Sequence, residues 1–144
     1  MFPEMFSQMM FKEAQTHLSK FNKIRELMAD PPKVKVGQSP CEVVFRKNKM
    51  KLLRYTPQVE KLKKPPVLIV YALVNRPYIL DLQRGRSVIQ TLLAEGYDTY
   101  LIDWGVPSDF DKHLSLTDYQ EKYIKRCIDQ IKKKTGSHQV SLIG

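Results

Sequence analysis

The segment Pro65–Gly105 constrains the fold of this 144-residue chain more than any other. It begins with an uninterrupted apolar run, Val67–Leu73, which is typical of a central strand that is covered on both faces. A polar loop, Ala72–Tyr78, overlaps the end of this run, and Ser87–Ala94 then places its apolar residues on one helical face. A second apolar run, Asp98–Trp104, predicts another buried strand. The order of strand, helix and strand predicts a parallel βαβ unit.

Two further strands are expected before this unit. The runs Glu42–Arg46 and Lys51–Tyr55 are strand-like and flank the polar turn Lys47–Lys49, so they predict an antiparallel hairpin. A charged linker that ends in two prolines, Thr56–Pro66, connects the hairpin to the first apolar run. We therefore expect the hairpin to precede the parallel part of the sheet.

A second helix and a third parallel strand are expected after the unit. Thr117–Lys134 has helical apolar spacing, Gln120 lies in capping-box position relative to Thr117, and Gly136 is expected to end the helix. The face expected to be buried consists of Tyr119, Tyr123, Ile124, Cys127, Ile128 and Ile131. The strand Val140–Ile143 follows. The complete pattern predicts an α/β fold in which a hairpin precedes a parallel, doubly wound βαβαβ sheet.

The first 30 residues differ in pattern from the rest of the chain. From Glu4 to Met28 the apolar residues follow helical spacing and the opposite face is charged, which predicts an amphipathic helix. Pro31 and Pro32 end this helix and begin an extended segment. We therefore expect an amphipathic segment over 1–30, a linker over 31–40 and a catalytic-type domain over 41–144. We expect the Met- and Phe-rich stripe to contact a partner subunit or another protomer; packing against its own domain is the alternative.

The net charge of +9 requires a test for nucleic-acid binding. The basic residues concentrate around the hairpin and in the last turn of the final helix, and zinc knuckles, RNP-like motifs and Arg-rich tails are absent from the sequence. We therefore expect an anionic coenzyme or an acidic partner, and no nucleic acid.

The longest apolar run, Val67–Val74, is shorter than the about 20 residues of a transmembrane helix. Two cysteines without metal-ligand spacing, and a start without a basic signal region, favour a cytoplasmic protein without a metal.

Three α/β folds compete for this order of elements. Dinucleotide-binding folds and P-loop proteins need glycines directly after the first parallel strand, whereas the turn Val74–Tyr78 has none. In α/β-hydrolases the loop after that strand donates a backbone N–H to the oxyanion, and a later strand runs into a G-x-nucleophile-x-G elbow. The sequence therefore predicts an α/β-hydrolase type of fold, with Val74 and Asn75 in the oxyanion loop and Gly144 at the start of the elbow. The Val74 N–H is the expected donor to the oxyanion. The equal alternative is that Val74 is simply the residue at the end of the strand and has no catalytic role. Asn75 is expected to stabilise the loop or meet phosphates, with a solvated turn as its alternative.

We expect no catalytic residue within the chain itself. Cys127 lies in mid-helix on the apolar face, so we interpret it as a core thiol, and Cys41 as a structural residue. His17, His113 and His138 have polar neighbours and no matching Ser, Cys or carboxylate motif, which indicates surface positions. The sequence shows no cofactor motif. The nucleophile is expected beyond the last residue.

Several blocks of the sequence resemble the catalytic subunit (PhaC) of polyhydroxyalkanoate synthases. The blocks are Gly37–Val44, Lys51–Tyr55, Tyr71–Gln83, Arg86–Val88, Tyr100–Gly105, Leu116–Tyr119 and Tyr123–Ile128. The resemblance covers nearly the whole chain after residue 36, and its central block is the most specific part. The motifs that begin at Asn75 and Asp81, together with Cys127, are most similar to the two-component branch (class III) whose partner is PhaE; the PhaR-dependent branch is the near alternative.

The resemblance implies a thioester chemistry. Family members carry a nucleophilic cysteine in a G-x-C-x-G elbow with a histidine and an aspartate further along, and Gly144 matches the first glycine of that elbow. It implies that 3-hydroxyacyl-CoA is polymerised into a polyester with release of CoA and without a cofactor. It also implies a PhaE-like or PhaR-like partner subunit, an oligomer, and a cytoplasmic location at the surface of polyester granules. The 144 residues alone are expected to be inactive. Two alternatives remain open: a fragment of a serine esterase or lipase, and a non-catalytic module that binds a partner or a granule.

Overall fold

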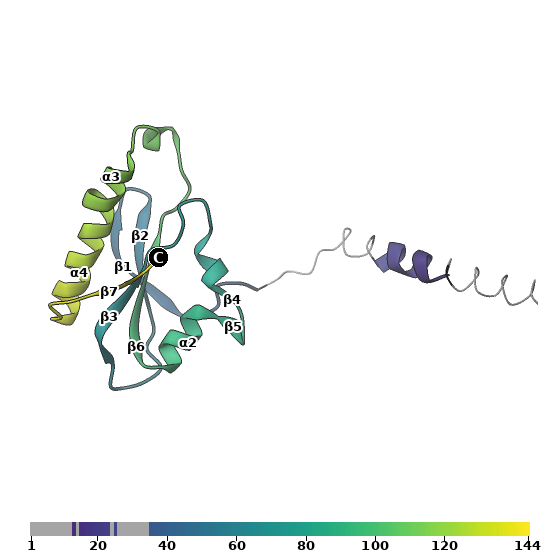
Figure 1. Ribbon diagram of the computed structural model, residues 1–144, viewed down its shortest axis with the longest axis horizontal. Helices are drawn as coiled ribbons and strands as arrows, with labels where there is room; N and C mark the ends of the chain where they lie inside the picture. The colour runs from purple at the N-terminus through teal and green to yellow at the C-terminus, as the bar shows by residue number, and fades with distance from the viewer. Residues whose placement is uncertain (1–12, 14, 24, 26–34) are drawn as a thin grey trace, which may run out of the picture. The chain divides into compact units, whose positions relative to one another are not determined.

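The computed structural model describes residues 13, 15–23, 25 and 35–144, and the chain divides into two units, residues 1–34 and residues 35–144 (Figure 1). The described residues of the first unit are helical, and the side chains of Leu18 and Phe21 are exposed. The rest of the expected amphipathic helix, and the two prolines after it, lie outside the described residues.

The second unit is built on a five-stranded sheet with the strand order β1-β2-β6-β3-β7. The hairpin strands β1 (Cys41–Lys47) and β2 (Met50–Tyr55) pair antiparallel, and β2 also pairs antiparallel with β6 (Tyr97–Asp103). The strand β3 (Lys63–Ile69) pairs parallel with β6 on one side and with β7 (Ser141–Ile143) on the other. The hairpin and the three parallel strands that the sequence predicts are thus confirmed as parts of one mixed sheet.

Helices cover both faces of this sheet (Figure 1). The helix α2 (Val88–Ala94) packs Ile89 and Leu93 on one face. The strand residues of that face are Tyr55, Val67, Ile69 and Leu101. A long helix covers the other face with Tyr123, Cys127 and Ile131, and the strand residues there are Met50, Leu52, Leu68, Tyr100 and Ile102. Alternate residues of β3 and β6 therefore belong to different cores, as the pleat of a strand requires. This explains why both runs are apolar throughout.

The long helix has three parts: α3 (Leu116–Asp118), a π-helical segment (Tyr119–Ile124) and α4 (Lys125–Thr135). Its buried face is the predicted one. Its capping box, however, is formed by Ser115 and Asp118, so the prediction of Thr117 and Gln120 is wrong. The Asp118 carboxylate accepts the Ser115 N–H at 2.9 Å, and the Ser115 hydroxyl accepts the Asp118 N–H at 3.2 Å. Thr117 is already inside the first turn, where its side chain cannot cap the helix.

The region between the hairpin and the first parallel strand also differs from expectation. We expected a linker up to Pro66, but β3 begins at Lys63, whose N–H donates to the Gly96 carbonyl at 2.8 Å. Pro65 and Pro66 lie between Lys63 and Val67, where the register with β6 is interrupted. Because no regular pairing occurs there, the N–H that each proline lacks removes no hydrogen bond from the sheet. The strand therefore starts earlier than its apolar run.

Between β3 and α2 the structure adds elements that the sequence did not predict. A 3₁₀ turn, Pro77–Leu80, follows the loop after β3. Two very short strands, β4 (Asp81–Gln83) and β5 (Arg86–Ser87), then form a separate two-stranded sheet. The Ser87 hydroxyl caps α2 by accepting the Gln90 N–H at 3.0 Å.

Candidate functional site

The candidate site lies at the carboxyl edge of the parallel strands. Because β3 and β7 are parallel neighbours with Ile69 opposite Ile143, the chain leaves both strands at the same edge. The Val70 N–H donates to the Ile143 carbonyl at 2.8 Å, and a Cβ atom on Gly144 would lie 3.7 Å from the Val70 carbonyl oxygen. The structure therefore brings Gly144 next to the start of the loop after β3.

The two residues expected in that loop have different backbone roles. The Asn75 N–H donates to the Ala72 carbonyl at 3.2 Å and closes a turn. The side chain of Val74 is 92% exposed, and among residues 35–144 its N–H has no hydrogen-bond partner. A backbone donor is thus free at Val74 and engaged at Asn75.

A tryptophan holds the first residue of the loop. The indole N–H of Trp104, at the end of β6, donates to the Tyr71 carbonyl at 2.9 Å. The Trp104 ring is buried and packs edge-on against Tyr119, with 5.3 Å between the ring centroids. Trp104 is therefore a core residue at the end of the predicted buried run, and it adds a hydrogen bond from the core to the loop. Burial raises the pKa of the nearby Tyr71 hydroxyl to about 12, so that group stays protonated at neutral pH.

The turn after Trp104 depends on a glycine. Gly105 has a φ of +71°, a region that favours glycine, and a Cβ atom there would lie 2.8 Å from the Lys49 carbonyl oxygen. Its N–H donates to the Asp103 carboxylate at 3.0 Å. The hairpin turn therefore approaches the end of β6 more closely than any side chain at position 105 would permit.

A buried carboxylate that sequence reasoning missed lies at the other end of the loop. Asp81 is 2% exposed, and one of its oxygens accepts the Ser39 N–H at 2.8 Å. The other oxygen accepts the hydroxyls of Ser39 at 3.0 Å and of Ser87 at 2.6 Å. The signal that could have revealed it is a single acidic residue between the apolar Leu80 and Leu82.

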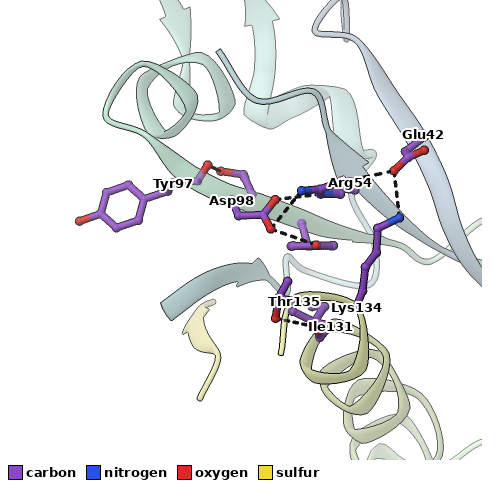
Figure 2. A network of polar contacts seen from close by, with 9 residues as sticks. Glu42, Arg54, Tyr97, Asp98, Ile131, Lys134 and Thr135 are labelled. Atoms are coloured by element: carbon purple, nitrogen blue, oxygen red, sulfur yellow. Dashed lines mark hydrogen bonds and ion pairs between the residues drawn. The ribbon is translucent and has the colours of Figure 1, made fainter. Parts of the chain in front are cut away.

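A second polar cluster lies near the start of β6 and links four elements (Figure 2). Arg54 donates to both carboxylate oxygens of Asp98, at 2.9 and 3.3 Å, and the Tyr100 hydroxyl donates to one of them at 3.1 Å. Lys134 of α4 contacts Glu42 of β1 at 3.1 Å, and Glu42 in turn lies 4.0 Å from Arg54. Because Asp98 is fully engaged by these partners, we assign this cluster a structural role.

The remaining candidates are distributed away from the carboxyl edge. Cys127 is fully buried 3.8 Å from the Met50 sulfur, and burial raises the pKa of its thiol to about 12, so its interpretation as a core residue is confirmed. Cys41, expected to be structural, is the first residue of β1, where it pairs with Tyr55, and it is exposed. The three histidines are exposed, as predicted.

Within residues 13, 15–23, 25 and 35–144, no group of three or more His, Cys, Asp or Glu side chains could hold a metal ion. In the same part of the chain, no helix has both the length and the apolar character needed to cross a membrane.

The fold and this edge define a mixed α/β protein whose sheet contains parallel strands and is covered by helices on both faces. Residues 10–92 match the family model described as the N-terminus of poly-beta-hydroxybutyrate polymerase (PhaC). Because this match covers more than half of the chain, the chain belongs to the PhaC family.

Individual relatives agree with this assignment. The poly(3-hydroxyalkanoate) polymerase subunit PhaC of Haloferax mediterranei is 53% identical over 111 residues, which are 77% of this chain and 23% of that protein. The proteins of the same name from Synechocystis sp. and Thiocystis violacea are 48% and 42% identical, over 77% and 92% of this chain and 29% and 38% of their own lengths. The chain thus spans between about a quarter and two fifths of the length of these relatives.

Proposed function

We propose that the chain forms part of the catalytic domain of a poly(3-hydroxyalkanoate) synthase of the α/β-hydrolase type. Such an enzyme polymerises 3-hydroxyacyl-CoA and releases CoA through a cysteine thioester. The observation that carries the proposal is the position of Gly144 beside Val70, at the start of the loop with the free Val74 N–H. A nucleophile two residues after Gly144, in a G-x-C-x-G elbow, would stand next to that donor.

The loop would supply the electrostatic part of the chemistry. Attack of a thiolate on the thioester carbonyl places a negative charge on its oxygen, and a backbone N–H aimed at this oxygen stabilises the transition state by about 2.7–4 kcal/mol. The Val74 N–H is the proposed donor, and Asn75 keeps the turn closed. A cysteine suits this reaction because its thiolate forms near neutral pH and later transfers the acyl group. Cys127 does not fill this role, because it is buried in the core.

A pair of substitutions at Val74 tests this role. The variants are made in a chimera in which this chain replaces the matching segment of the Synechocystis relative, and CoA release from 3-hydroxybutyryl-CoA is followed with a thiol reagent. Val74→Pro removes the N–H and is expected to lower kcat by about 10²–10³-fold. Val74→Ala keeps the N–H and should retain activity, because the side chain is exposed. A Val74→Pro chimera that is folded and has nearly full activity would contradict the proposal.

Two further observations separate the competing functions. The 144 residues alone should release no CoA above a Cys127→Ala control. The codon two positions after Gly144 in the gene separates synthase from serine esterase or lipase, because cysteine indicates the first and serine the second. The exposed Leu18 and Phe21 favour, as a second function, a helix that binds a partner subunit or a granule surface. If the 144-residue chain binds such a partner but the chimera that contains it is inactive, the result would support the binding function and not the catalytic one.

We also propose the partners and location of the complete enzyme. The motifs at Asn75 and Asp81 favour a PhaE-like partner over a PhaR-like one, and an oligomer of the two subunits. The granule surface and the cytoplasm are the corresponding locations. The net charge of +9 is suited to an anionic coenzyme or an acidic partner.

A further inference from the structure

The loop after β3 is held at both of its ends. We call residues 72–80 the edge loop. Its first end follows Tyr71, whose carbonyl accepts the Trp104 indole N–H at 2.9 Å. Its second end leads directly into Asp81, which is 2% exposed. The edge loop itself is largely exposed, so these two ends carry its connections to the core.

The carboxylate of Asp81 joins segments that are far apart in the sequence. Ser39 contributes its N–H to one carboxylate oxygen at 2.8 Å and its hydroxyl to the other at 3.0 Å. Ser87 contributes its hydroxyl at 2.6 Å, and the same hydroxyl caps α2. Hydrogen bonds to an ionised acceptor are about twice as strong as bonds between neutral groups, so these contacts form a firm junction.

The backbone before Ser39 strengthens the same junction. The Gly37 N–H donates to the Asp81 carbonyl at 2.8 Å. A Cβ atom on Gly37, where φ is +62°, would lie 3.4 Å from the Cβ atom of Tyr78. Gly37–Ser39 therefore lies directly on the 3₁₀ turn of the edge loop and on the first residue of β4.

We infer that Asp81 is a positioning residue: through Ser39 and Ser87 it fixes the carboxyl end of the edge loop and so holds the Val74 N–H in place. The kinetic part of this inference rests on the proposed function. A carboxylate with three donors and little exposure cannot move without losing those bonds. Without them, the carboxyl end of the edge loop would keep only the backbone bond from Gly37 and the packing of Leu80 against the core.

The test compares four variants. Asp81→Ala removes all three acceptor contacts, and Ser39→Ala removes one of them while keeping the backbone N–H. Asp81→Asn is the conservative variant, because its amide oxygen can accept the Ser39 N–H and its NH₂ group can donate to the two hydroxyls. Asp129→Ala, an exposed carboxylate on α4, is the matched control.

Amide hydrogen exchange in the 144-residue chain reads the loop position without requiring activity. We expect Asp81→Ala to accelerate exchange of the two hydrogen-bonded amides of the edge loop, Asn75 and Ile79, at least tenfold, and Ser39→Ala to do so less. The amides of β3 and β6 should stay protected and show that the fold is intact. Asp129→Ala should leave the loop unchanged, and Asp81→Asn, which can keep the three contacts without the charge, should accelerate exchange much less than Asp81→Ala. Unchanged exchange in Asp81→Ala, or equal acceleration in Asp81→Asn, would overturn the inference.

Kinetics of the Synechocystis chimera then separate this inference from the proposed function. If both hold, Asp81→Ala lowers kcat at least tenfold with KM within about twofold, and Asp81→Asn restores most of it. An active chimera in which Asp81→Ala keeps its kcat would overturn the positioning role. An inactive chimera with the unsubstituted chain would count against the proposed function only, because the exchange experiment decides the position of the loop.

Discussion

Replacing Arg54 by alanine is expected to destabilise the second unit strongly, because the change leaves a buried carboxylate without its cation. The Asp98 side chain is 7% exposed, and Arg54 bonds both of its oxygens, at 2.9 and 3.3 Å (Figure 2). After the substitution the Tyr100 hydroxyl, at 3.1 Å, is the remaining donor among the described side chains that bond this carboxylate. The pair also connects β2 to β6, at the junction between the hairpin and the parallel strands.

The expected cost follows from the burial of the pair. Removing one partner of a buried ion pair costs about 3–5 kcal/mol, because the other charge stays desolvated. The Arg54 side chain is 24% exposed, so water reaches part of the vacated space, and we expect the lower end, about 3 kcal/mol. With a urea m value of about 1–3 kcal/mol/M, this loss lowers the unfolding midpoint by at least about 1 M.

Two further variants make this result specific to burial. Lys63→Ala removes an ion pair with Glu95 whose N–O distance is 3.2 Å but whose side chains are 51% and 66% exposed, and it should cost less than about 1 kcal/mol. The double variant Arg54→Met with Asp98→Leu removes both charges but leaves the Tyr100 hydroxyl without its acceptor, so its stability should lie between those of Arg54→Ala and the unsubstituted chain.

Urea unfolding monitored by the fluorescence of Trp104, the single tryptophan, and by far-UV circular dichroism measures these differences. The expected midpoint is lowest for Arg54→Ala, higher for the double variant, and nearest to that of the unsubstituted chain for Lys63→Ala. An Arg54→Ala midpoint equal to that of Lys63→Ala would refute the reasoning, since burial would then not determine the cost.

Three other predictions follow from the same structure. Ellman's reagent should react with one thiol of the folded chain, that of the exposed Cys41, and with a second thiol only after unfolding in guanidinium. The reason is that Cys127 is buried and its thiol has a raised pKa. Rapid reaction of two thiols in the folded state would contradict this prediction. Burial raises the pKa of Tyr71 to about 12 and raises those of Tyr55 and Tyr100 further, so the folded state favours their neutral forms. This stabilisation is complete below pH 10 and is lost as the pH rises above it, so phenolate absorbance at 295 nm should show a late phase that coincides with loss of circular dichroism. Finally, Phe21→Asp should weaken co-purification of a PhaE-like partner, whereas the control Ser19→Asp should not. Neither variant should change the unfolding midpoint of the second unit. A lowered midpoint in Phe21→Asp would instead assign the helix to the core.

Local patterns along the chain predicted most of the regular elements. The apolar runs of β3 and β6, the spacing of Tyr123, Cys127 and Ile131, and the alternating hairpin are each read within about 18 residues, and the structure confirms them. They are local because a helix or strand that buries a face must repeat apolar residues at its own period. The family blocks likewise lie in contiguous residues, and the comparisons agree with them.

The connections of the site were decided by the tertiary structure. Asp81 and Ser39 are 42 residues apart, and Arg54 and Asp98 are 44 apart, so no local period links them. The strand register determines which polar groups meet, and the same register brings Gly144 beside Val70. The sequence named Val74 and Asn75 together, but only the folded turn shows that the Asn75 N–H is engaged by Ala72 while the Val74 N–H is free among residues 35–144. A backbone donor is the same chemical group at every residue except proline, so its availability is determined by conformation and not by residue type.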